Sequence, residues 1–168
     1  MSLGASNAVG KPDRGAIDSL GILVSDKGKG GVQLDFGGFA VVDEPAEGVV
    51  SFTFDDGYKE HLSAAKLLAE RGWRGTAYVI PETIGASIYL TLADLAEIQR
   101  LGTDVAAHDD PPFTQLAPND LEPRLRGIQS FLVEHGYALG AQHLAYPLGK
   151  QETRRVRPTV NKLFATAR

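Results

Sequence analysis

Apolar residues follow two different spacings along residues 47–168. Five short apolar runs, rich in β-branched and aromatic residues, predict buried strands at residues 49–54, 75–80, 103–107, 141–146 and 163–167. Between these runs, apolar residues recur every three or four positions, which is the spacing of helices that bury one face. The predicted helices cover residues 58–71, a segment that begins at Thr91, residues 119–136, and a weaker segment that Pro158 interrupts. Strands that alternate with helices predict an α/β fold with a parallel sheet.

Two of the predicted helices carry specific signals. Thr91, followed three residues later by Asp94, is typical of a capping box at a helix start. The helix at 119–136 carries one apolar stripe that is expected to face the core, made of Leu121, Leu125, Ile128 and Leu132.

Residues 1–46 have a different pattern. They are rich in glycine, and their short apolar runs are broken by glycine-containing turns, as in GILVSDKGKGGVQLDFGGF at residues 21–39. This pattern predicts a Gly-rich N-terminal arm with short β-hairpins. A leader that becomes ordered only by packing on the main body fits the pattern equally well. The α/β domain is therefore expected over residues 47–168.

Composition narrows the class of protein. The chain has 168 residues, of which 43% are hydrophobic and 23% charged, as in globular domains. A net charge of −4 without a basic patch argues against nucleic acid as a partner. The absence of cysteine excludes a disulfide framework and a thiolate metal site. No membrane span and no signal peptide are expected, because no stretch approaches roughly 18–20 apolar residues and the N-terminus lacks an apolar core.

Polar residues gather where three of the predicted strands end. Asp55 and Asp56 follow the first strand, residues 108–110 (His-Asp-Asp) follow the third, and residues 147–149 (Pro-Leu-Gly) follow the fourth. Because active sites in parallel α/β folds lie at the carboxyl ends of the strands, these three groups are expected on one face of the sheet. An acidic pair at this place is also typical of a helix N-terminal cap.

The motifs TFDDG at residues 53–57 and AYPLG at residues 145–149, with His108 between them, resemble the polysaccharide deacetylase family. This is the NodB-homology group, carbohydrate esterase family 4, and the resemblance covers residues 47–168, including the closing NKLFATAR. It implies a distorted, incomplete (β/α) barrel with parallel strands. It also implies a hydrolase that removes N-acetyl or O-acetyl groups from glycans with a divalent metal, often zinc.

The resemblance also implies roles for single residues. Asp55 matches the general base of the first motif and Asp56 a metal ligand, while His108 matches the first histidine of the second motif. In the third motif, the backbone N–H of Leu148 matches a donor of the oxyanion hole. Tyr146 and Pro147 are expected to contact the substrate.

Two positions depart from the family pattern. Pro112 stands where the family has a second metal-binding histidine, and Ala145 stands where it has the arginine that orients the base. Pro111 and Pro112 favour an extended backbone before them, which would place Asp110 on the same side as His108 and Asp109 on the opposite side. The hypothesis is a metal site of Asp56, His108 and Asp110, at which metals harder than zinc compete better. A metal site that has decayed is an equally good interpretation.

Two other functions stay open. A glycan-binding barrel without catalysis would explain both departures, and a phosphoacceptor receiver domain also carries an acidic pair after its first strand. The family's remaining motifs, which include a general-acid histidine, would follow residue 168, so the barrel is expected to be incomplete at its C-terminal side. An open sheet edge would then be covered by residues 1–46, by further chain or by a partner copy, and the last case would give an oligomer. Family members are often secreted or bound to the cell envelope, and the sequence leaves the location of this chain open.

Overall fold

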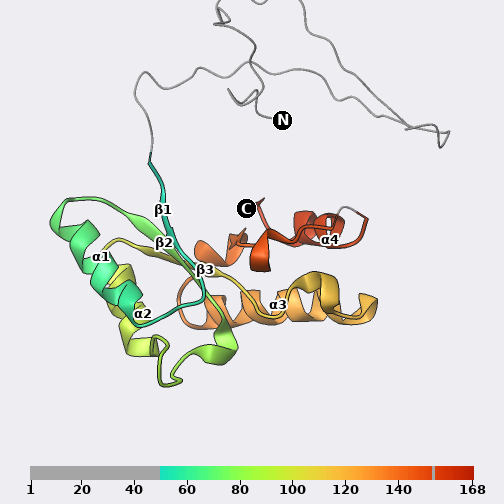
Figure 1. Ribbon diagram of the computed structural model, residues 1–168, viewed down its shortest axis with the longest axis horizontal. Helices are drawn as coiled ribbons and strands as arrows, with labels where there is room; N and C mark the ends of the chain where they lie inside the picture. The colour runs from blue at the N-terminus through green and yellow to red at the C-terminus, as the bar shows by residue number, and fades with distance from the viewer. Residues whose placement is uncertain (1–49, 153) are drawn as a thin grey trace, which may run out of the picture. The chain divides into compact units, whose positions relative to one another are not determined.

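The computed structural model describes residues 50–152 and 154–168, which form nine main elements (Figure 1). The predicted N-terminal arm at residues 1–46 lies outside the described residues. The strands are β1 (Phe52–Phe54), β2 (Gly75–Val79), β3 (Asp104–Ala107), β4 (His143–Leu144) and β5 (Thr166–Ala167). The helices are α1 (Glu60–Glu70), α2 (Leu92–Arg100), α3 (Pro118–Glu134) and α4 (Val156–Leu163). No helix in the described ranges is long and apolar enough to cross a membrane.

The five strands form one parallel sheet in chain order, β1-β2-β3-β4-β5. The sheet curls into an incomplete barrel with helices outside it, so the predicted fold class is confirmed. A doubly wound receiver domain has the order 2-1-3-4-5, with helices on both faces of its sheet. The receiver alternative is therefore wrong.

The two faces of the sheet have different environments. Alternate residues of β2 and β3, such as Ala77 and Val105, belong to the main core under the helices. The core also takes in the predicted stripe of α3, which is fully buried. The intervening residues point to the opposite, inner face, where Tyr78, Ala106 and Ala145 form a separate small cluster. Figure 1 shows α1 beside α2 at one end of the sheet and α3 with α4 toward the other.

Local signals set several helix boundaries as predicted. The capping box at the start of α2 is confirmed, because the Thr91 hydroxyl accepts from the Asp94 amide and the Asp94 carboxylate accepts from the Thr91 amide. These bonds from Thr91 lower the pKa of Asp94. Pro158 does not interrupt α4, contrary to the prediction. It is the third residue of that helix, where the backbone lacks an intrahelical acceptor and a missing N–H costs little.

The fourth and fifth strands are shorter than the sequence pattern predicts. Residues 140–142 form a 3₁₀ turn, and the strand begins only at His143. α4 continues to Leu163, so β5 contains residues 166 and 167 alone. The turn at 140–142 passes so close to β3 that a side chain on Gly140 would overlap the carbonyl oxygen of Val105.

This close approach predicts that Gly140→Ala destabilises the fold by about 1–3 kcal/mol, because the added methyl group must displace backbone rather than a side chain. Gly127→Ala is the matched control. Gly127 lies inside α3 with open space around it, so alanine is expected to stabilise the helix by about 1 kcal/mol. Urea denaturation of both variants measures the difference. Equal stability of the two variants would contradict the packing of residues 140–142 against β3.

Candidate active site

The acidic pair lies in a tight turn directly after β1. Asp56 and Gly57 both have left-handed backbone conformations, with φ of 73° and 83°. The turn is fixed from two sides: the Leu90 amide donates to the Gly57 carbonyl at 2.8 Å, and a β-carbon on Gly57 would lie 3.4 Å from the side chain of Val79. The N-cap of α1 is Lys59, without a side-chain hydrogen bond. The cap interpretation of the acidic pair is therefore wrong, and both carboxylates are left for another role.

The structure brings His108 and Asp56 together across the end of the sheet. His108 follows β3, is 4% exposed, and has Nδ1 at 2.8 Å from the carbonyl oxygen of Ala145. A carbonyl can only accept, so Nδ1 carries a hydrogen and the neutral ring presents a lone pair at Nε2. Nε2 lies 3.1 Å from Oδ1 of Asp56. Two acceptors face each other, and a cation between them or a proton on Nε2 satisfies both.

The third predicted ligand does not join this pair. Within the described ranges, no three His, Asp or Glu side chains come close enough to hold one metal ion. Asp110 is exposed. Pro112, which occupies the position of the family's second metal-binding histidine, stands at the start of a 3₁₀ turn. Asp56 and His108 thus form a two-residue set, and the role of Asp110 stays a prediction.

Asp109 lies between these residues but serves the fold. Its side chain is 1% exposed and receives two hydrogen bonds from Arg124 of α3, one of them from Nε to Oδ2 at 2.8 Å. The Asp110 amide adds a third bond to the same carboxylate, and Arg124 also pairs with Glu82. Bonding to Asp109 raises the pKa of the Arg124 guanidinium. This network ties the segment after β3 to α3, which holds His108 in place.

The segment after β4 contains a second strained turn. Leu148 has φ of 53° and ψ of 22°, and its side chain is exposed. Among the described residues, Asp56 and Leu148 are the two non-glycine residues with positive φ, a conformation that costs on the order of 1–3 kcal/mol. Both are predicted site residues, and strain of this kind concentrates at functional sites. Tyr146 and Pro147 are buried, and their predicted contact with substrate is untested.

Arg168 is a site residue that the motifs do not point to. It follows β5, and its guanidinium forms an ion pair with Oδ1 of Asp55 and lies over the ring of Tyr78, 4.6 Å from the ring centroid. The sequence does contain a signal for it, because this arginine follows the fifth predicted strand. The carboxyl ends of parallel strands lie along one edge, so a polar residue at this position is expected near the others.

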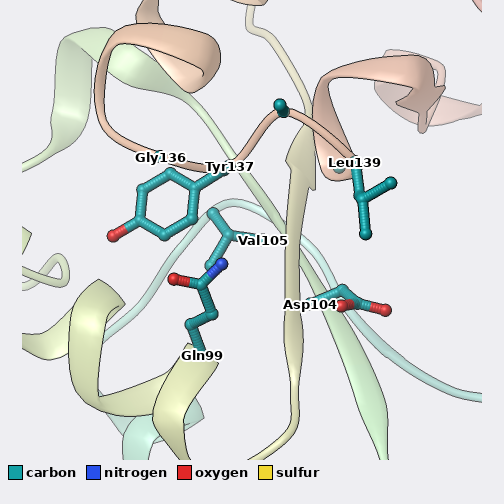
Figure 2. A pocket seen from close by; sticks show the side chains of 8 residues that line it. Gln99, Asp104, Val105, Gly136, Tyr137 and Leu139 are labelled. Carbon is teal, nitrogen blue, oxygen red and sulfur yellow. The ribbon is translucent and has the colours of Figure 1, made fainter.

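A separate small pocket of about 130 Å³ lies at the opposite end of β3. Figure 2 shows Gln99 and Tyr137 on one side of Val105, with Asp104 and Leu139 on the other. Asp104 begins β3, whereas His108 follows its last residue. This pocket is therefore no part of the site at the carboxyl ends.

Comparison with known proteins supports one family. The sequence profile of the polysaccharide deacetylase family matches residues 43–166, which is most of the chain. YxkH of Bacillus subtilis (strain 168), whose name places it among the polysaccharide deacetylases, is 26% identical over 110 residues. That match covers 64% of this chain and 39% of YxkH.

Solved structures share the fold. The Streptococcus pyogenes deacetylase PplD in complex with acetate superposes with a TM-score of 0.64 at 23% identity, covering 72% of this chain and 55% of PplD. A family 4 carbohydrate esterase from Streptomyces lividans, also in complex with acetate, gives a TM-score of 0.59 at 21% identity, covering 71% of this chain and 61% of the esterase. The chain thus spans less than two thirds of these relatives.

The dependence of the buried Asp109 carboxylate on Arg124 can be tested by replacing arginines of α3. Arg124→Ala is expected to lower the free energy of unfolding by about 3 kcal/mol, because it leaves a buried carboxylate without its partner. Arg126→Ala is the matched control, since Arg126 forms only an exposed pair with Glu122 on the same helix, and it should change stability by about 0.5 kcal/mol or less. Denaturant unfolding of both variants measures this. Similar effects would show that Asp109 does not depend on Arg124.

Proposed function

The chain belongs to the polysaccharide deacetylase family, and from this premise we propose that it is a hydrolase that removes acetyl groups from an N-acetylated or O-acetylated polysaccharide. The observation that carries the proposal is the approach of His108 to Asp56, 3.1 Å apart at the carboxyl ends of parallel strands, with Asp55 directly before Asp56 in the chain. Acetate, the product of such a hydrolysis, is bound in both similar structures described above.

Asp56 and His108 fit a divalent cation. Their facing acceptor atoms, 3.1 Å apart, need a positive charge between them. The bond from Nδ1 of His108 to the Ala145 carbonyl orients the ring in the way usual for metal-binding histidines. Zinc suits a nitrogen and oxygen ligand pair, and a third oxygen from Asp110 would favour harder metals. When bound, such a cation polarises a carbonyl group and makes water more acidic.

The chain's own residues supply the remaining functions. Asp55 is the proposed acceptor of a proton from the attacking water, because its carboxylate is part exposed and it directly precedes Asp56 in the chain. The backbone N–H of Leu148 is the proposed donor to the oxyanion. Leu148 adopts the left-handed turn although a leucine side chain rarely takes a positive φ. Tyr146 and Pro147 would line the substrate side of this turn.

We expect purified protein to bind one divalent cation and to release acetate from N-acetylchitooligosaccharides or acetylated xylan. Asp56→Ala should lose the metal and the activity together, since it removes one of two ligands. Asp55→Asn should keep the metal but lower turnover by at least about 10²-fold, because it removes the base alone. Elemental analysis and an acetate assay measure the two properties.

Glu70→Ala serves as a matched control, because it removes an exposed carboxylate at the far end of α1 and should change neither property. Metal that stays bound in Asp56→Ala would contradict the site. A parent protein without metal or acetate release that still binds these glycans would replace the hydrolase with the glycan-binding alternative.

A further inference from the structure

We propose that Arg168, which follows β5, positions the carboxylate of Asp55. It does so in place of the arginine that the family carries at position 145 after β4, where this chain has alanine. The proposal rests on the proposed role of Asp55 as the base. It names Arg168 as a positioning residue, which acts on the reaction through Asp55.

The backbone of Arg168 is held in the sheet although the residue follows β5. Its amide donates to the Leu144 carbonyl at 3.0 Å, and its carbonyl accepts from the Tyr146 amide at 2.8 Å. These two bonds continue the β4–β5 pairing by one residue. The starting point of the side chain is therefore fixed by the same ladder that fixes the segment after β4.

The guanidinium is held on two sides. It lies over the ring of Tyr78, which is 8% exposed, and it forms the ion pair with Oδ1 of Asp55. An arginine over an aromatic ring gains a cation–π attraction while its charge stays available to a carboxylate. Among the described residues, no hydrogen bond is made to Oδ2 of Asp55. One oxygen is thus anchored and the other is left to accept a proton.

The register explains why Ala145 is tolerated. His143 pairs with Thr166 and Leu144 with Ala167, so the next pair along the parallel ladder is Ala145 with Arg168. Paired residues of parallel strands point to the same face. Ala145 contacts Tyr78 and Ala106 on the inner face, and the Arg168 guanidinium reaches that same tyrosine. Strands in a sheet lie about 4.8 Å apart, a shift that a long arginine side chain can span.

Steady-state kinetics of acetate release test this assignment. Arg168→Ala should lower kcat by about 10²-fold, the loss expected when a reacting group is misplaced by about 1 Å. The Michaelis constant and the bound metal should stay within twofold of the parent, because Arg168 contacts neither metal residue. Arg168→Lys should recover part of the loss, since an ammonium group keeps the charge without the planar fork. Arg126→Ala, which breaks an exposed pair on α3, should have no effect.

Relocation of the arginine separates positioning from a structural role. Arg168→Ala combined with Ala145→Arg should regain at least tenfold in kcat over Arg168→Ala, because the new side chain starts from the neighbouring strand at the same level. An unchanged kcat in Arg168→Ala would overturn the proposal. A loss of kcat that comes with an equal loss of bound metal, and that relocation does not recover, would also overturn it.

A second measurement does not depend on activity. Nitrogen-15 NMR of the arginine side chains should show restricted rotation of the Arg168 guanidinium in the parent and free rotation in Asp55→Ala. Free rotation in the parent would overturn the positioning proposal whatever the activity. Restricted rotation that Asp55→Ala releases, in a protein that releases no acetate, would support the positioning of Asp55 and overturn the proposed function.

Discussion

The structure depends on one constraint, which is that five strands run parallel and in chain order. All five carboxyl ends therefore lie along the same edge, and the residues that follow β1, β3, β4 and β5 meet there without any helix crossing between them. Because the helices of the described ranges cover the outer face, the main core forms there and not at the strand ends. On the inner face, Tyr78 packs beside the small residues Ala106 and Ala145, and the charged groups of the site lie near the exposed edge of the sheet.

Three consecutive residues after β3 show how the chain divides its polar side chains between fold and site. Asp109 is buried, and Arg124 matches its charge, so this carboxylate is fully used by the fold. His108 is equally buried, but one of its nitrogens is turned toward a carboxylate that cannot donate. Asp110 is exposed. The first arrangement is complete without a ligand, whereas the second is completed by a bound cation or by a proton on Nε2, so His108 and not Asp109 is the candidate ligand.

The sequence predicts those features that depend on neighbours along the chain. Helix stripes, the Thr91 cap and the polar strand ends are local patterns, and each is found where it is expected. The Asp109–Arg124 pair and the Asp55–Arg168 pair join residues 15 and 113 positions apart, and no local pattern specifies such pairs. The start of β4 also depends on a distant contact, because Gly140 turns against β3. The excess of strand predicted at residues 141–142 has this cause.

The departures from the deacetylase motifs differ in what they remove. At Leu148 the motif needs a backbone donor in a left-handed turn, so a change of side chain leaves the chemistry intact as long as the turn persists. At Ala145 the motif needs a charged side chain, and only another side chain at the same edge can supply it, which Arg168 does from the next strand. At Pro112 the motif needs a metal ligand, and no third ligand stands near Asp56 and His108 in the described part of the chain. The proposed base and the proposed oxyanion donor thus keep the groups that the motifs need, whereas the proposed metal site lacks a third ligand, so cation binding is the step on which the proposed hydrolase depends most.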